Sequence, residues 1–250
     1  MNGKNSEKNA NFFKQNLSLI LPCYNEKDNL KPVVESALKI LKEIAREFEI
    51  IIVDDGSTDG TGELAEELVN TYPQVRLVQH PKNLGYGSAL RSGFKKAKYR
   101  WLFFTDADQQ FDLSEIKKLL PYLEQSPLVI GYRQNRRDKF HRRLLGELFS
   151  FLMRNIFKIK ARDVNCAFKI FDRKILEGVE LKSPGALINA ELLYRAKEKG
   201  IEPIEVAVSH FPRKTGKPSG GSFRVIFRAG WETIRLIYHF WREKIQASRS

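Results

Sequence analysis

The sequence contains little cysteine and no long apolar run. Its 250 residues include two cysteines, Cys23 and Cys166, too few for the disulfide framework of a small secreted protein. We therefore expect two small core residues in a reducing, cytoplasmic compartment. No run of about 18 uninterrupted apolar residues occurs, which predicts no transmembrane helix. Residues 1–16 lack the apolar core of a signal peptide and are predicted to be a disordered leader.

Acidic residues are scarce in the second half of the chain. Residues 1–132 contain 17 basic and 18 acidic residues, whereas residues 133–250 contain 26 and 12, so the net charge of +13 comes from the second half. This asymmetry indicates either an anionic partner, such as a membrane, a nucleic acid or a phosphorylated substrate, or a solvated basic face. No RNA-binding signature with interleaved aromatic residues occurs, so we expect no nucleic acid partner.

The chain alternates short apolar runs with stretches of helical periodicity. This alternation predicts an α/β domain over residues 17–210, built on a doubly wound, mainly parallel sheet. The predicted strands cover residues 17–23, 49–53, 75–79, 100–105, 128–131, 163–171 and 203–209. The predicted helices cover residues 28–47, 61–71, 86–98, 112–123, 187–199 and 223–245.

Four polar motifs follow the predicted strands or open the next helix. The carboxyl ends of parallel strands form the edge at which an open α/β sheet binds ligands. Acidic groups there suit a metal ion, and backbone amides at helix starts suit phosphates, so the motifs predict a site for a metal-bound nucleotide diphosphate. They are Pro22-Cys23-Tyr24-Asn25-Glu26, Asp54-Asp55-Gly56-Ser57-Thr58-Asp59, Asn83-Leu84-Gly85-Tyr86-Gly87 and Asp106-Ala107-Asp108-Gln109-Gln110.

The fourth motif is the predicted metal site. Asp106, Asp108 and Gln110 offer hard oxygen ligands at alternate positions, which suits Mg²⁺ or Mn²⁺ bridging a diphosphate. The alternative is a helix-capping loop with solvated carboxylates. An isolated Asp-x-Asp would favour that alternative, but the upstream motifs in register favour the metal.

The other motifs are predicted to contact the donor. The carboxylates of Asp54 and Asp55 can accept hydrogen bonds from a base or ribose, although an Asx-type turn with a helix cap is the alternative. The remaining predicted contacts are Tyr24 to a base, Glu26 to a ribose, Lys82 to a phosphate, and the backbone at Gly85, which permits a positive φ and close approach.

The ordered set of motifs resembles glycosyltransferase family 2, whose members have the nucleotide-sugar-binding GT-A fold. Within that family it is most similar to the dolichol-phosphate mannose synthases and the bacterial polyprenyl-phosphate glycosyltransferases, over roughly residues 17–210. The resemblance implies that Pro22, Tyr24, Glu26 and Asp55 hold the nucleoside. It also implies that Asp106, Asp108 and Gln110 bind metal and diphosphate.

Further segments resemble the polyprenyl-phosphate branch. Gly131-Tyr132-Arg133 implies that Arg133 faces the acceptor phosphate, and Arg213 resembles a basic residue near both substrates. Two more segments match, Asp163-Val164-Asn165-Cys166-Ala167-Phe168-Lys169 and Asn189-Ala190-Glu191. The loop that contains Arg213 differs from the usual mannose-synthase version, so it does not fix mannose as the sugar.

Acceptor chemistry separates two functions. A phosphate monoester is already mostly dianionic at pH 7, so it needs cations instead of a base, and Arg133, Arg142 or Arg143, and Arg213 could supply them. We therefore expect an inverting transferase that moves mannose or glucose from a nucleotide diphosphate sugar to a polyprenyl phosphate, with Asp108, Arg133 and Arg213 as catalytic residues. The alternative is a sugar hydroxyl acceptor in polysaccharide or glycolipid synthesis, for which Glu191 would be the base. A structural role for Glu191 is favoured.

Two basic, apolar segments suit a membrane surface. Residues 140–159 and 223–245 combine apolar and aromatic residues at helical spacing with flanking arginines, as in interfacial helices. The alternative is a helix docked on the catalytic core or at a dimer interface. We expect residues 211–250 to form a basic loop and an interfacial helix, with the protein peripheral on the cytoplasmic face of a membrane. A separate membrane-anchoring subunit is a further candidate partner.

Overall fold

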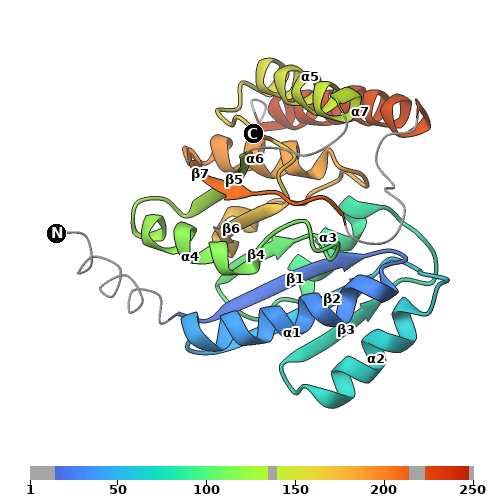
Figure 1. Cartoon of the computed structure of the whole chain (residues 1–250). Coiled ribbons are helices and arrows are strands. Elements are labelled where there is room, and N and C mark those ends of the chain that lie inside the picture. Colours follow the sequence, from blue (N-terminus) through green and yellow to red (C-terminus); the bar gives the residue numbers. More distant parts are fainter. Residues whose placement is uncertain (1–14, 135–139, 214–222, 248–250) are drawn as a thin grey trace.

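The computed structural model describes residues 15–134, 140–213 and 223–247. These residues build a seven-stranded sheet in the order β3-β2-β1-β4-β6-β5-β7, with helices on both faces (Figure 1). β6 pairs antiparallel with both neighbours, and every other pairing is parallel. The strands are β1 (Leu17–Cys23), β2 (Phe48–Asp54), β3 (Val75–Gln79), β4 (Trp101–Thr105), β5 (Leu128–Gln134), β6 (Phe168–Asp172) and β7 (Ile204–Ser209). The predicted doubly wound, mainly parallel sheet is confirmed.

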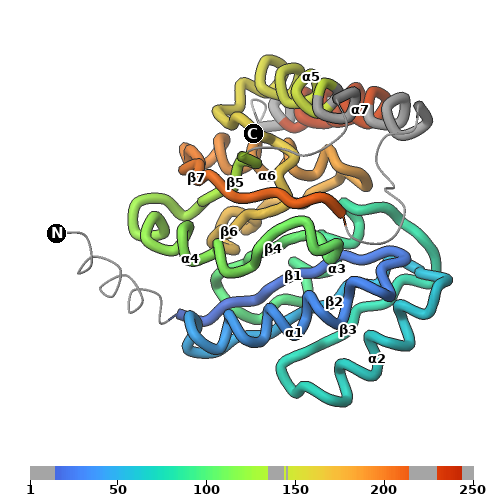
Figure 2. Tube along the Cα trace, in the orientation of Figure 1, coloured from blue at the N-terminus to red at the C-terminus, as the bar shows by residue number. Residues whose placement is uncertain are grey.

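Six of the helices described lie between strands in the chain, and α7 follows the last strand; the tube in Figure 2 traces this path. They are α1 (Lys27–Ile44), α2 (Thr61–Thr71), α3 (Tyr86–Lys96), α4 (Ile116–Leu119), α5 (Phe140–Phe157), α6 (Ile188–Glu198) and α7 (Phe223–Ala247). None of the helices described is both long enough and apolar enough to cross a bilayer.

Two predicted elements were wrong over most of their extent, and two more at one end, because β5 continues to Gln134 and α1 ends at Ile44. The helix expected over 112–123 is one turn of α-helix, α4, between two 3₁₀ turns, Leu113–Glu115 and Leu120–Glu124. Pro121 lies in the second turn, and its missing N–H cannot continue an α-helical ladder. The strand expected over 163–171 begins only at Phe168, because residues 163–167 form a turn.

The sheet separates two apolar cores. Alternate residues of each strand point to opposite faces, so Leu19 packs in the core under α1, α2 and α4, and Ile20 in the core under α3, α5, α6 and α7. The second core includes a cluster in which the Phe240 ring of α7 stacks on Tyr194 of α6 at 4.2 Å and meets Phe157 of α5 at 5.8 Å between centroids. These contacts dock α5 and α7 on the same face of the domain.

Candidate active site

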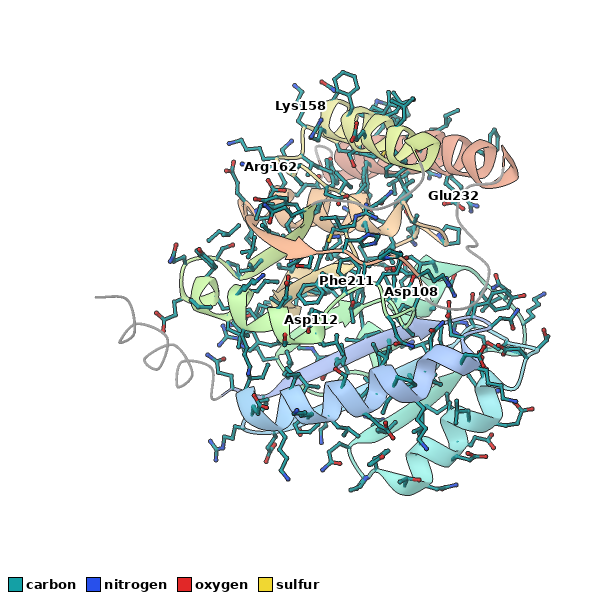
Figure 3. The ribbon with its side chains drawn as sticks, in the orientation of Figure 1. Asp108, Asp112, Lys158, Arg162, Phe211 and Glu232 are labelled. Atoms are coloured by element: carbon teal, nitrogen blue, oxygen red, sulfur yellow. The ribbon has the colours of Figure 1, made fainter. Side chains whose placement is uncertain are left out.

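The carboxyl ends of β1, β2 and β4 bring three of the four motifs to one edge of the sheet. β1 pairs with β2 in register up to Cys23 and Asp54, and with β4 on its other side. Asp108 follows the end of β4 at this edge, near Phe211 beyond the end of β7 (Figure 3). Residues far apart in the sequence therefore lie together at this edge of the sheet.

Asp54 is buried and organises the turn that follows β2. Its carboxylate accepts a hydrogen bond from the backbone N–H of Ser57 at 3.0 Å, a second from the Ser57 hydroxyl, and a third from the Gln79 side chain at 3.2 Å. This arrangement is the turn-forming alternative that the sequence left open for this motif. A contact between Asp54 and a nucleotide remains a prediction.

Asp55 is also buried and holds the glycine loop in place. Its carboxylate accepts hydrogen bonds from the backbone N–H groups of Leu84 and Gly85 at 2.9 and 2.8 Å. The ring of His80 lies 2.7 Å from the same carboxylate through Nδ1. Because a carboxylate only accepts, Nδ1 is the protonated nitrogen of His80. Asp55 thus fixes the loop that opens α3, and direct contact with a nucleoside remains a prediction.

The glycine loop needs its glycines for two reasons. Gly85 has a φ of +100°, which residues with a Cβ rarely adopt. Gly87 lies so close to the loop before α6 that an added Cβ would be 2.3 Å from the Ser183 carbonyl oxygen. The Lys82 side chain is exposed beside this loop, as its predicted phosphate contact requires.

The first motif places one exposed and two less exposed side chains at the edge. Pro22 is buried within β1, whereas the Tyr24 side chain is 40% exposed and could lie against a base. Glu26 is engaged by protein groups: Asn29 donates to its Oε2 at 2.8 Å, and Arg213 donates to its Oε1. Burial raises the pKa of Glu26 above its usual value, and these two hydrogen bonds oppose that shift.

Asp106 and Asp108 crowd two carboxyl groups together at the end of β4. Burial raises the pKa of the Asp106 carboxyl to about 7, and the charge of Asp108 adds to the shift, while Tyr86 opposes it. Two like charges in a partly dry site fit a divalent cation, which would relieve their repulsion. Among the residues described, no group of three acidic, histidine or cysteine side chains forms a ready-made metal cage, so further oxygens would have to come from Gln110 and from a bound diphosphate.

The loop that contains these carboxylates is fastened on both sides. Gln109 has a φ of +59° and donates to the side-chain oxygen of Asn29 on α1 at 3.0 Å. Gln110 donates through its side-chain nitrogen to the carbonyl of Phe211 at 3.0 Å, and its own carbonyl accepts from the Phe211 N–H at 2.8 Å. The side-chain oxygen of Gln110 is the atom that would ligate a metal.

Arg213 lies among the predicted donor and metal residues. It pairs with Glu26, and its Nη1 lies 3.8 Å from Oδ2 of Asp108. The structure therefore brings together three residues predicted from separate motifs, although the side chains of Glu26 and Arg213 are 187 positions apart in sequence.

Arg133 is held by an acidic residue to which the sequence assigned no role of its own. Its Nε and Nη2 donate to the two carboxylate oxygens of Asp163 at 2.6 and 2.8 Å, a side-on pair with both side chains about one-eighth exposed. The side chains of the other predicted acceptor residues, Arg142 and Arg143, lie outside the described part of α5.

A buried lysine supports this region; the sequence placed it in a segment that resembles the polyprenyl-phosphate branch but assigned it no role. Lys169 is fully buried in β6 and donates to the Val164 carbonyl at 3.1 Å, to the Cys166 carbonyl, and to the Asn189 side chain at 3.0 Å. Burial lowers the pKa of Lys169 to about 8. Its position inside the otherwise apolar run of β6 was the available signal.

Glu191 is fully buried and fixes a loop. Its two carboxylate oxygens accept hydrogen bonds from the backbone N–H groups of Lys182 and Ser183, both at 2.8 Å. This is the structural role that the sequence favoured, although backbone amides are the donors instead of a basic side chain.

A cavity of about 600 Å³ opens beside this cluster. Apolar side chains of α1 and of the segment after β7 form much of its wall, and Asp106 and Arg213 are among its charged lining residues. Its lining consists of Pro32, Val33, Ser36, Asp106, Gln109, Phe111, Asp112, Leu113, Phe211, Pro212 and Arg213.

Residues 18–179 match the family model described as glycosyl transferase family 2. The match covers more than half of the chain, so the chain belongs to this family.

Two of the curated relatives have names that include a polyprenyl or dolichyl phosphate. Dodecaprenyl-phosphate galacturonate synthase of Rhizobium johnstonii is 31% identical over 84% of this chain and 64% of its own length. Dolichol-phosphate mannosyltransferase of Pyrococcus furiosus is 31% identical over 89% of this chain and 62% of its own length. The chain thus spans less than two thirds of either relative.

Solved structures share the fold at lower identity. Glucosyl-3-phosphoglycerate synthase of Mycobacterium tuberculosis, solved with phosphoglyceric acid, has a TM-score of 0.64 at 19% identity over 81% of this chain and 73% of its own. The mannosyltransferase PcManGT of Pyrobaculum calidifontis, solved with GDP-Man and Mn²⁺, has a TM-score of 0.59 at 18% identity, over 84% and 59% respectively. These likenesses show the shared GT-A fold.

Proposed function

We propose that this chain is a metal-dependent inverting glycosyltransferase that moves a sugar from a nucleotide diphosphate sugar to the phosphate of a polyprenol. The donor would lie at the edge formed by β1, β2 and β4, with its nucleoside near Tyr24 and the glycine loop. Asp106, Asp108 and Gln110 would hold Mg²⁺ or Mn²⁺, which when bound stabilises charge on the leaving diphosphate.

The observation that carries the choice of acceptor is the state of Glu191. A sugar hydroxyl needs a general base because its pKa is far above 7. Glu191, the residue that could have been that base, is fully buried and commits both carboxylate oxygens to backbone amides. A phosphate acceptor needs no base, so the arrangement favours the polyprenyl phosphate over the hydroxyl acceptor.

Two arginines support the same choice. Arg133 is held by Asp163 and Arg213 by Glu26, and both act on the candidate metal loop: the charge of Arg133 lowers the pKa of Asp106, and Arg213 lies 3.8 Å from Asp108. Their bidentate forks suit phosphate oxygens, and two phosphorylated substrates can approach one another only if cations offset their repulsion. The acceptor phosphate would attack the anomeric carbon in line and give a β-linked phosphosugar.

The relatives differ in the sugar that they are named for. The relatives named above carry galacturonate and mannose in their names, and a third, from Pectobacterium carotovorum subsp. carotovorum, carries 4-deoxy-4-formamido-L-arabinose. Mannose and glucose remain our first candidates, with UDP- and GDP-linked donors tested side by side.

The test is a transfer assay in detergent with paired lipid acceptors. We expect product from polyprenyl phosphate and none from the matching free polyprenol, with loss of product in EDTA and recovery in Mn²⁺. Asp108→Asn should lower the rate by at least roughly a hundredfold, because it removes a charge that holds the metal. Product from free polyprenol or from a sugar hydroxyl would contradict the proposal.

We further propose that α5 and α7 rest on a membrane surface. Each helix has an inner apolar face docked on the domain and a second, outer face of exposed apolar residues. The exposed residues are Leu144, Leu148, Phe151, Leu152 and Ile156 on α5, and Trp231, Ile234, Ile237, Tyr238 and Trp241 on α7. The exposed Arg235 and Arg242 on α7 suit anionic headgroups.

Vesicle binding tests this surface. We expect the protein to co-sediment with phosphatidylglycerol vesicles, and the double variant Trp231→Ser, Trp241→Ser to lose that binding. Tyr122→Ser, at an exposed aromatic residue outside α5 and α7, is the matched control and should bind normally. A monomeric double variant made from a dimeric parent would instead assign the surface to a protein interface.

A further inference from the structure

Two carboxylates, those of Glu26 and Asp108, face the guanidinium of Arg213 at the candidate metal loop. Glu26 and Asp108 are each 11% exposed at the side chain, Arg213 is 16% exposed, and Asp106 lies beside Asp108. Arg213 bridges Glu26 and Asp108, with Nη1 at 3.8 Å from the Asp108 oxygen. Among the residues described, Arg213 is therefore a cation that offsets the charges of Glu26 and Asp108 in the ligand-free protein.

The position of Arg213 is set by a relay of amide side chains that begins in the metal-binding loop. Gln109 donates to Oδ1 of Asn29 at 3.0 Å, and Asn29 donates through Nδ2 to Oε2 of Glu26 at 2.8 Å. Glu26 can only accept, so the nitrogen of the Asn29 amide must face it and the oxygen must face Gln109. Asn29 is 1% exposed on α1, so it cannot touch substrate. It acts by orienting Glu26.

We propose that Arg213 competes with the divalent cation for Asp108, and that Asn29 is the positioning residue that holds Arg213 there through Glu26. A guanidinium this close to Asp108 and a divalent ion bound to the same carboxylate repel each other strongly. Only one of them can balance Asp108 at a time. When the metal-bound donor occupies the site, Arg213 leaves the carboxylate and is available to phosphate oxygens.

This inference rests on the proposed function, but its test measures metal affinity instead of transfer. The probe is Mn²⁺ alone, without nucleotide, titrated by electron paramagnetic resonance or calorimetry. Arg213→Ala should bind Mn²⁺ on the order of tenfold more tightly than wild type, a typical size for coupling between two sites. If Arg213 only helped to build the site, its removal would weaken Mn²⁺ binding. Tighter binding in Arg213→Ala therefore supports competition, and weaker binding contradicts it.

Asn29→Leu separates competition from simple electrostatics. It changes no charge, yet it releases Glu26, so it should also tighten Mn²⁺ binding. The double variant Asn29→Leu, Arg213→Ala should bind no more tightly than Arg213→Ala alone, because both changes remove one competitor. Arg213→Lys keeps the charge and should remain close to wild type.

Several outcomes would overturn the inference. They are unchanged or weaker Mn²⁺ binding in Arg213→Ala, unchanged binding in a folded Asn29→Leu, or additive effects in the double variant. The net-charge control is Arg162→Ala, whose partner is Glu205, and equal tightening there would also overturn it. Failure of the proposed function is a different result: wild type would give no metal-dependent sugar transfer to polyprenyl phosphate, whatever the Mn²⁺ affinities of the variants.

Discussion

Asp163 binds Arg133 through two parallel hydrogen bonds, 2.6 and 2.8 Å long, and accepts a third from the Arg133 backbone N–H at 3.3 Å. This geometry fixes the direction of the guanidinium more firmly than a single contact could. Asp163 is therefore a positioning residue for the proposed acceptor phosphate, although it need not touch any substrate itself.

Asp163→Asn tests that role. The amide keeps the shape of the side chain but presents one N–H₂ towards Arg133, so the guanidinium should shift. We expect kcat/KM for polyprenyl phosphate to fall roughly ten- to hundredfold, the cost of slight misplacement of a reacting group. Nucleotide affinity in the presence of Mn²⁺, measured by calorimetry, should stay within about twofold. Equal losses in nucleotide and acceptor binding would contradict a role specific to the acceptor.

Asp55→Asn should damage the glycine loop before it damages chemistry. Asp55 accepts from Leu84, Gly85 and His80 at once, and an asparagine must turn an N–H₂ group towards one of these donors. A buried donor left without an acceptor costs about 1–3 kcal/mol. Urea unfolding should show that loss, together with weaker nucleotide binding. A variant as stable as wild type that nevertheless fails to bind nucleotide would favour direct nucleoside contact by Asp55.

The Asp106 carboxyl should make stability depend on pH. Its pKa is raised to about 7 in the folded protein, whereas an unfolded aspartate titrates near 4, so the folded state binds the proton more tightly. The stabilisation from this group is complete below about pH 4 and is lost as the pH rises to about 7. Metal-free wild type should therefore lose stability relative to Asp106→Asn over that interval.

Denaturant unfolding of both proteins between pH 4 and 8 measures this difference. A constant difference in the free energy of unfolding would contradict the raised pKa. The stabilisation of wild type by Mn²⁺ should change with pH in the opposite direction. It should be larger at pH 8 than at pH 6, because the metal competes with the proton on Asp106.

Gly87→Ala and Gly230→Ala form a matched pair. At Gly87 an added Cβ would lie 2.3 Å from the Ser183 carbonyl oxygen and 2.7 Å from that of Gly185, so the loop before α6 must move away from α3. We expect a loss of about 1–3 kcal/mol in stability. At Gly230, in α7, a Cβ meets nothing within 4 Å, and alanine should stabilise the helix by about 0.5–1 kcal/mol. Thermal unfolding measures the stability of both variants. If Gly87→Ala raised the stability as Gly230→Ala does, the close approach at Gly87 would be contradicted.

The boundaries of helices and strands were predicted well where neighbouring residues alone determine them. β1 and β2 are mostly apolar runs, typical of strands covered on both faces, and the boundaries of β1, β3 and α2 agree with those expected. The order of the sheet could not be predicted, because nothing in the sequence of β6 says that it runs antiparallel between β4 and β5.

The sequence predicted which residues belong to the candidate site, but only partly which of them contact one another. Motif position placed Glu26, Asp108 and Arg213 at the site, yet no pattern could say that Arg213 would pair with carboxylates in the ligand-free protein, because that contact joins distant segments. Asn29 was missed, and Lys169 was quoted in a matched segment without a role, because their importance comes from burial and hydrogen bonding, which periodicity does not report.

The place of β6 in the sheet has a consequence for how the chain is made. β4 is complete at Thr105, but its outer neighbour begins only at Phe168. During synthesis, at roughly 5–20 residues per second, the nascent N-terminal half would wait on the order of several seconds with β4 paired to β1 on one side and open on the other. An open strand edge can recruit other chains, so co-translational aggregation should begin at the outer edge of β4, and a ribosome pause between these two strands should increase it.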